Sequence, residues 1–197
     1  MDTPLTGASR SWIDAACAEL ASIAPKPTTA AVEALSRRLA ALAFDRACPR
    51  APEPAASAGG ADYRRHPLAG GGAHAYTCLL IAWPPAHRTP IHDHAGLWGI
   101  ELVLDGALAV EEFTLGGDLE QPALAPARTL LLGVGDTAVF GGRRYAHRCR
   151  NLSPTRGALS LHVYGGVLDR YHAFHTDARG GYRSRAEHAR VDATLAI

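Results

Sequence analysis

The stretch "TPIHDHAGLWGIELVLDG", Thr89 to Gly106, places two histidines directly before a long apolar run. His92 and His94 are separated by one residue, and side chains at positions i and i+2 of an extended segment point to the same side. Both imidazoles can therefore reach one metal ion, while Asp93 points the other way. Taken alone, such a pair is equally compatible with the solvated edge of a strand.

Short apolar runs separated by Gly, Pro and Asp follow from about Tyr76 onward. They read "YTCLLIAW", "GIELVLDGALAVEEFTL", "RTLLLGVGDTAVF" and "GALSLHVYGG". This punctuation is typical of an antiparallel barrel or jelly roll. The N-terminal part differs, because apolar residues recur there at spacings of three and four, which predicts helices. The first helix is expected from Trp12 to Ile23, and the second begins after Thr28 or Thr29, either of which can cap it.

The predicted fold is therefore mainly β, with α-helices preceding a barrel. The expected divisions are a helical segment at 1–50, a Pro- and Ala-rich linker at 51–62, the barrel at 63–180 and a polar tail at 181–197.

The composition limits the classes of function. The chain has 197 residues, 47% of them hydrophobic, and its formal net charge is +1. That is enough apolar content for one core, and the charge balance argues against a nucleic-acid partner. Because no apolar run approaches the roughly 18 residues of a membrane span, no membrane partner is expected either. The four cysteines form no CxxC pair and the start shows no signal-peptide pattern, which favours a reduced, cytoplasmic protein.

A second stretch, "GDTAVFGGRRYAHRCRN" from Gly135 to Asn151, adds a third histidine, His147. It resembles the second cupin motif, in which a glycine-punctuated turn ends in a histidine followed, after three residues, by an asparagine. The stretch with the histidine pair resembles the first cupin motif. The resemblance implies that the three histidines bind one metal ion together.

The carboxylate expected in the first cupin motif is missing. Counting back from Gly106, its place falls on Gly99, and Glu101 lies two residues too far along. A cupin with three histidines and no carboxylate resembles a non-haem iron site with open positions for substrate and oxygen. Facial sites of three histidines also occur with zinc.

The segment "SLHVYGGVLDRYHAFHTDARG" resembles the most specific piece of the cysteine dioxygenase type I family, a Ser-x-His-x-Tyr triplet followed by His-Ala-Phe. The resemblance covers roughly residues 63–180 and includes "IHDH" residue for residue. It implies a cupin jelly-roll barrel in which Ser160, His162 and Tyr164 form a relay aimed at the metal. Alternation along a strand puts these three side chains on one face.

Substrate choice in this family is associated with a position shortly after a tyrosine. Cysteine dioxygenases carry Arg there, and related bacterial enzymes acting on 3-mercaptopropionate carry Gln. The matching residue is Arg65, two after Tyr63, so the chain resembles a bacterial Arg-type member. A guanidinium suits a small carboxylate. Arg64 should point away, and Trp83, which matches a family tryptophan, is expected in the core near the pocket.

The resemblance implies a non-haem iron(II) thiol dioxygenase that oxidises L-cysteine to cysteine sulfinic acid with O2. The thiol and O2 are then its small-molecule partners. Three alternatives stay open: 3-mercaptopropionate as substrate of the same site, a zinc or manganese cupin such as an isomerase, and a cupin ligand-binding or sensing module without turnover.

Several positions depart from the family pattern. Gly99 stands where mammalian members carry a cysteine crosslinked to the relay tyrosine, so Tyr164 should be a free phenol. Tyr171 replaces a cysteine near the pocket mouth, and Gly165-Gly166 replaces Ser-Pro; both changes can reshape the pocket.

Histidines and cysteines outside the motifs have simpler expected places. Most of these histidines should lie at the surface, His172 should be intermediate, and two cysteines should be buried. The surface set is His66, His74, His87, His175 and His188, and the buried cysteines are Cys78 and Cys149.

Overall fold

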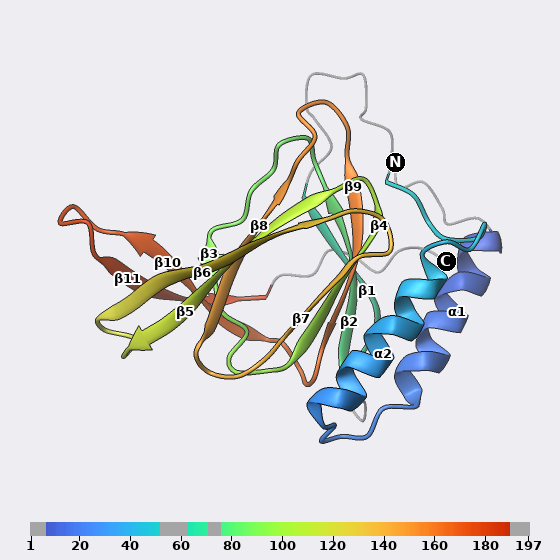
Figure 1. Ribbon diagram of the computed structural model, residues 1–197, viewed down its shortest axis with the longest axis horizontal. Coiled ribbons are helices and arrows are strands. Elements are labelled where there is room, and N and C mark those ends of the chain that lie inside the picture. The colour runs from blue at the N-terminus through green and yellow to red at the C-terminus, as the bar shows by residue number, and fades with distance from the viewer. Residues whose placement is uncertain (1–6, 52–62, 71–75, 190–197) are drawn as a thin grey trace.

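The computed structural model describes residues 7–51, 63–70 and 76–189, and these form two helices followed by eleven strands (Figure 1). The elements are α1 (Gly7–Ala21), α2 (Thr29–Leu42), β1 (Arg64–Gly70), β2 (Thr77–Trp83), β3 (Ile91–His92), β4 (Gly99–Asp105), β5 (Leu108–Gly117), β6 (Pro122–Leu132), β7 (Thr137–Phe140), β8 (Tyr145–Asn151), β9 (Ala158–Tyr164), β10 (Arg170–Thr176) and β11 (Tyr182–His188). The prediction of a mainly β protein with N-terminal helices is confirmed.

The strands build two facing sheets, the arrangement of a cupin jelly roll (Figure 1). One sheet has the order β1-β2-β9-β4-β7 and the other the order β11-β10-β3-β8-β5-β6. All pairs of neighbouring strands are antiparallel. Strand β9 is buried along its whole length, which requires cover on both faces of its sheet.

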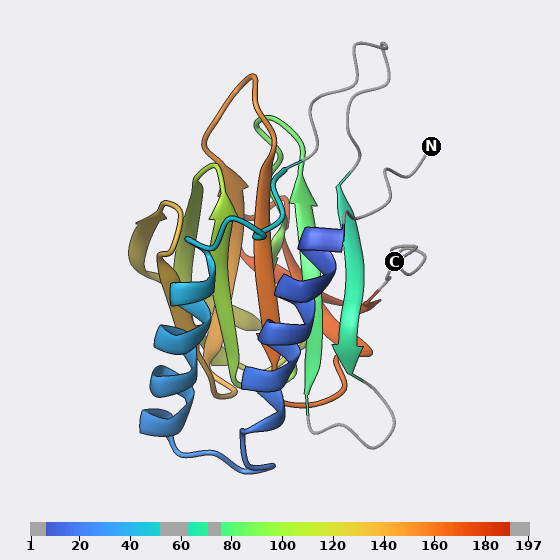
Figure 2. The same ribbon diagram turned by 90° about the vertical axis from the view of Figure 1, so that its right-hand side faces the viewer.

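The helices supply that cover, since both lie across the outer face of the five-stranded sheet (Figure 2). Leu35 of α2 belongs to one buried cluster with Leu80 of β2 and Leu102 of β4. The indole N–H of Trp12 donates to the carbonyl of Leu42 at 2.7 Å, which ties the two helices together. None of the helices that the structure describes is long and apolar enough to cross a membrane.

The ends of the elements refine the sequence-based boundaries. Thr28 is the N-cap of α2, and its hydroxyl accepts a hydrogen bond from the backbone N–H of Ala31 at 3.2 Å. Residues 52–62 of the expected linker lie outside the described residues. The segment expected to be a C-terminal tail contains a strand, β11, which pairs with β10 along its full length. Its side chains are mostly exposed, so apolar periodicity could not have predicted this strand.

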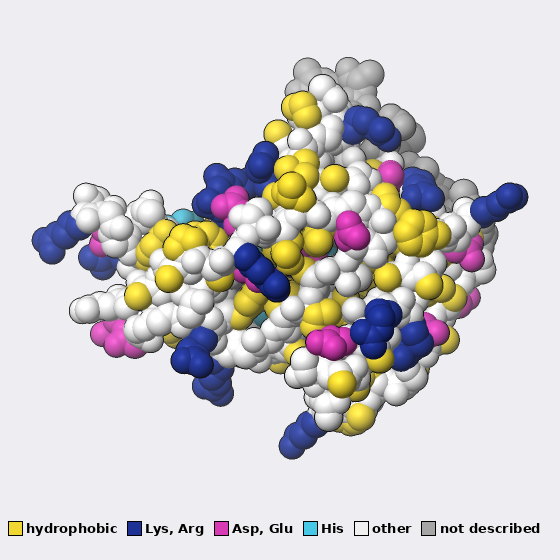
Figure 3. Space-filling model, viewed as in Figure 1, with side chains coloured by type: hydrophobic (Ala, Val, Ile, Leu, Met, Phe, Trp, Pro, Cys, Tyr) yellow, Lys and Arg dark blue, Asp and Glu magenta, His cyan; other side chains and the backbone are white. Residues whose placement is uncertain are grey.

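Polar side chains gather inside the barrel, between the two sheets. The buried ones on this inner face are His94, Glu101, His147, Ser160 and His162. Cys78 and Cys149 are also buried, as predicted. On the face shown in Figure 3, lysine and arginine side chains are scattered, some at the edges and some near the middle. The polar side chains that could form a functional site are therefore buried between the two sheets.

Candidate metal centre and its cavity

Three imidazoles meet between the sheets. His92 ends β3, His94 follows two residues later, and His147 of β8 is the direct cross-strand partner of His92. One ring nitrogen of each lies within 4.8 Å of the others, and the Nε2 atoms of His92 and His147 are 3.3 Å apart. The structure thus brings together the three histidines that the sequence nominates as metal ligands.

The surroundings of these rings suit a metal ion. Nδ1 of His92 lies 3.0 Å from the carbonyl of Pro90, so its N–H donates there and Nε2 carries the lone pair. Both ring nitrogens of His94 are buried without a hydrogen-bond partner among the described residues. Such an orphaned polar group is costly, and a cation would satisfy it. The donor set therefore fits a divalent transition metal.

The protonation of the three rings also suits metal binding. Desolvation lowers the pKa of His92, and burial holds the pKa values of His94 and His147 well below the usual range. At His94 and His147 the neighbouring imidazoles lower the pKa further. All three rings are thus neutral near pH 7, the state in which histidine binds a metal.

The place of the missing carboxylate is filled by an aromatic ring. A Cβ atom at Gly99 would overlap the ring of Phe140, and this ring stacks on His94 with 4.7 Å between centroids. Gly99 is also the cross-strand partner of Tyr164. Neither a fourth ligand nor a crosslinking cysteine has room at this position while Phe140 keeps its place.

The hydrogen bonds along the Ser-His-Tyr triplet of β9 fix which group donates and which accepts at each step. The indole of Trp83 can only donate, and it donates to Ser160 Oγ at 2.7 Å. The serine O–H is left to donate to Nε2 of His162 at 2.8 Å. The proton of the neutral ring then sits on Nδ1 and is donated to Tyr164 Oη at 3.2 Å. The phenolic O–H of Tyr164 is then left to donate elsewhere, and the ring of Tyr164 lies beside that of His94 with 4.9 Å between centroids.

Two pKa shifts keep this chain of hydrogen bonds uncharged. Burial lowers the pKa of His162 to about 3. Burial also raises the pKa of Tyr164 well above its usual range, and Glu101 adds to the rise. Imidazole and phenol both remain neutral near pH 7.

A cavity of about 310 Å³ opens onto His92 and His94. Arg65 and Tyr63, the residues proposed to bind the substrate, line it, while Arg64 is exposed. Trp83 lines it too, and the ring of Tyr63 packs edge-on against this indole with 5.1 Å between centroids. Two guanidinium groups, those of Arg65 and Arg88, thus share a small, partly aromatic cavity with the candidate metal centre, and that of Arg88 is paired with Glu111 at 3.2 Å.

The remaining histidines were predicted correctly only in part. His175 and His188 are exposed, as predicted, and His74 lies outside the described residues. His66 and His87 are half-buried, so the surface prediction was wrong for them. His87 lines the cavity, because the turn after β2 folds it back onto Tyr63, where the two rings stack with 4.4 Å between centroids.

The other departures from the family pattern lie beside the cavity. Tyr171 lines it. A Cβ atom at Gly165 would overlap the indole of Trp98, and one at Gly166 would come within 2.8 Å of Leu97. The glycine pair therefore lets the segment after the histidine pair pack closely against the end of β9.

Asp93 points away from the candidate metal centre, as the alternation predicts. Its carboxylate accepts from the backbone N–H of His172 at 2.8 Å and lies 3.1 Å from Nδ1 of that ring. These bonds tie the histidine pair to β10. His172 is half-buried, which agrees with its intermediate expectation.

Glu101 is the main feature that the sequence analysis missed. It is 1% exposed, and its Oε1 lies 3.4 Å from Nδ1 of His162 and 3.5 Å from Nδ1 of His147. Burial raises its pKa to about 8. The alternation of a strand could have predicted this position. Ile100 and Leu102 pack against the helices, so the side chain of the residue between them must point into the barrel.

A jelly roll that holds three neutral imidazoles between its sheets is a cupin with a candidate three-histidine metal centre. Residues 60–177 match the family described as cysteine dioxygenase type I. The chain belongs to this family.

The chain is also similar to individual proteins named as cysteine dioxygenases. The chain is 27% identical to human cysteine dioxygenase type 1 over 110 residues, which cover 56% of this chain and 54% of that protein. It is 26% identical to the Danio rerio protein of the same name over 109 residues, 55% of this chain and 53% of that one. The chain thus spans about half the length of the curated relatives it matches.

Solved structures give remoter likenesses. Hydroquinone 1,2-dioxygenase PnpCD matches with a TM-score of 0.41 and 20% identity, over 55% of this chain and 68% of that one. The cupin domain of Schizosaccharomyces pombe Cnp3 matches with a TM-score of 0.41 and 9% identity, over 52% of this chain and 64% of that one.

Proposed function

We propose that this protein is an Arg-type thiol dioxygenase that uses iron(II) and O2 to oxidise L-cysteine to cysteine sulfinic acid, in the cytoplasm. The observation that carries the proposal is one cavity lined by His92, His94 and the guanidinium of Arg65, with His147 completing the group of three imidazoles beside it. The reaction balances without a further reductant. Both atoms of O2 enter the product, the sulfur loses four electrons, and O2 gains four.

His92, His94 and His147 are the residues that would hold the iron. When bound, the ion supplies the redox chemistry and lowers the pKa of a coordinated thiol. The protein's part is to bind the substrate, orient it and exclude water. A cavity of about 310 Å³ suits a small molecule.

Arg65 gives the cavity a preferred end for a carboxylate. A guanidinium can donate two parallel hydrogen bonds to a carboxylate. Tyr63 packs at the same end, against Trp83 and His87. A carboxylate bound there leaves the thiol end of a short substrate facing the histidines.

Tyr164 is the group proposed to donate a hydrogen bond at the reacting sulfur or oxygen. Its O–H is free to do so because His162 donates to its oxygen. Trp83 and Ser160 keep that imidazole in the required tautomer. The high pKa of Tyr164 keeps the proton on the phenol near pH 7.

Oxygen uptake by the iron(II)-loaded protein tests the proposal, with L-cysteine and 3-mercaptopropionate run in parallel and products identified by mass. Turnover of cysteine far above the other thiol, with a sulfinate product, is expected. Preference for 3-mercaptopropionate would retain the metal site and reject the substrate assignment. No uptake with either thiol, despite bound iron, would favour a sensing module or an isomerase.

A further inference from the structure

We propose that Glu101 is a positioning residue that holds the metal ligand His147 and the relay histidine His162 at the same time. The metal centre and the Tyr164 hydroxyl would then depend on one shared hydrogen-bond acceptor. This inference rests on the proposed three-histidine metal site and not on which thiol is the substrate.

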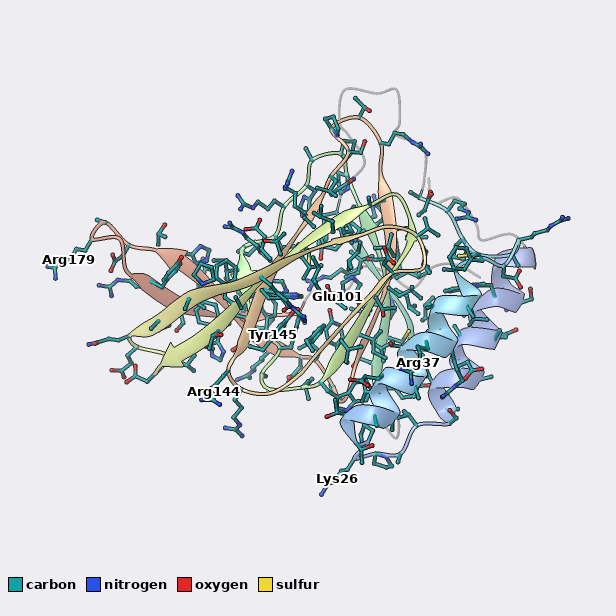
Figure 4. The ribbon with its side chains drawn as sticks, in the orientation of Figure 1. Lys26, Arg37, Glu101, Arg144, Tyr145 and Arg179 are labelled. Atoms are coloured by element: carbon teal, nitrogen blue, oxygen red, sulfur yellow. The ribbon has the colours of Figure 1, made fainter. Side chains whose placement is uncertain are left out.

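The position of Glu101 follows from strand register. Glu101 of β4 and His162 of β9 are direct cross-strand partners, so their side chains share one face. His147 comes from β8 in the opposite sheet. Oε1 of Glu101 lies 3.4 Å from one Nδ1 and 3.5 Å from the other. A single carboxyl group therefore bridges the two sheets, and Figure 4 shows Glu101 between them. Burial by itself raises the pKa of this group to about 8, and a divalent cation held by His147 would favour its ionised form.

The groups around this carboxylate are hydrogen-bond donors. With Nε2 of His147 on a metal, the remaining ring proton sits on Nδ1, which faces Glu101. The relay direction places the ring proton of His162 on Nδ1 as well. The thiol of Cys149 donates to both carboxylate oxygens, at 3.7 and 3.6 Å. Each ring N–H is shared with a tyrosine, that of His162 with Tyr164 Oη at 3.2 Å and that of His147 with Tyr145 Oη at 3.1 Å. Oε1 of Glu101 is the second, longer contact that the two N–H groups have in common.

Tyr145 offers a contrast, because it contacts the metal ligand alone. Its Oη lies 3.1 Å from Nδ1 of His147 and 3.5 Å from Oε1 of Glu112, which is paired with Arg128. Figure 4 labels Tyr145 on the side of the six-stranded sheet. Loss of this hydroxyl should disturb the metal ligand and leave the relay histidine unchanged.

The same atoms allow a competing arrangement. Glu101, His147 and Cys149 each place a ligand atom within 4.8 Å of the others, a grouping that could hold a second cation. His147 would then have to bridge two metal ions through its two nitrogens. The stoichiometry of metal binding separates this arrangement from the proposed one.

Zinc(II) is the probe for the test, because it is diamagnetic and its binding needs no turnover. We would measure the zinc dissociation constant and the ¹⁵N and Nδ1–H resonances of the histidine rings. Glu101→Gln should weaken zinc binding about 10- to 100-fold and shift the signals of both His147 and His162. Tyr145→Phe should shift the signals of His147 only.

Glu111→Gln is the matched control. Glu111 lies on β5 and is paired with Arg88 at 3.2 Å and Arg148 at 2.6 Å. The described structure records no contact between its carboxylate and a histidine ring. Zinc affinity and the histidine resonances should be unchanged in this variant.

Three results would overturn the inference: unchanged signals at both histidines in Glu101→Gln, a change at His147 alone, or two zinc ions bound per wild-type chain. If Glu101→Gln does not fold, Glu101→Asp replaces it. That variant withdraws the carboxylate by one methylene and should disturb both rings. Failure of the proposed oxidation would appear separately, as no oxygen uptake by the wild-type iron protein.

Discussion

Adding a single methyl group at Gly99 should destabilise the protein, because the Cβ of Gly99→Ala would overlap the Phe140 ring. The backbone of Gly99 needs no special conformation, since its φ is not among the positive values. The cost is therefore one of packing, and inserting a methyl group into a filled core costs about 1 to 3 kcal/mol. For a chain of this size, each kcal/mol lowers Tm by about 2 to 4 °C.

Guanidinium chloride unfolding of the metal-free protein measures this cost, with Gly133→Ala as the control. A Cβ at Gly133 would meet only Asp136 Oδ2, at an ordinary 3.6 Å. This control should be neutral or stabilising by about 0.4 to 1 kcal/mol.

A double-mutant cycle with Phe140→Leu tests the cause. The two changes should cost less together than the sum of the single effects, with a coupling of about 0.5 to 3 kcal/mol. Strict additivity, or a neutral Gly99→Ala, would refute the claim that Phe140 fills the ligand slot.

Further predictions concern the proposed chemistry and its pH dependence. Tyr164→Phe should lower turnover by about 10²-fold or more without loss of iron; unchanged turnover, with iron content as the control, would contradict the donor role. Arg65→Gln should raise KM for L-cysteine by about 10- to 100-fold, the value of a lost charge-assisted hydrogen bond, and affect 3-mercaptopropionate less; equal effects on both thiols would count against the substrate assignment. His162 has a pKa lowered to about 3, so the unfolded chain binds more protons between pH 6.5 and 3. Its contribution to stability is full above pH 6.5 and is lost as pH falls toward 3. The stability of His162→Gln should therefore depend less steeply on pH over this window, as unfolding of metal-free protein at several pH values would show.

Much of the candidate site follows from local pattern. The histidine pair and the Ser-His-Tyr triplet each sit at i, i+2 spacing, and the alternation of a strand alone puts their side chains on one face. The same reasoning separates Arg65 from Arg64. Apolar periodicity also distinguishes the N-terminal helices from the barrel, since the periods of 3.6 and 2 are properties of short segments.

Other features depend on which distant segments lie side by side. The pairing of His92 with His147, the Phe140 ring in the space above Gly99, and the place of Glu101 between two histidines all arise from cross-strand register and sheet packing. The polar strand β11 is held by its backbone pairing with β10 and not by an apolar face. The sequence by itself therefore determined the ligand types, the strand faces and the family. Only the tertiary structure decided what fills the fourth ligand position and which carboxylate stands behind the metal ligand, because those contacts join residues far apart in the chain.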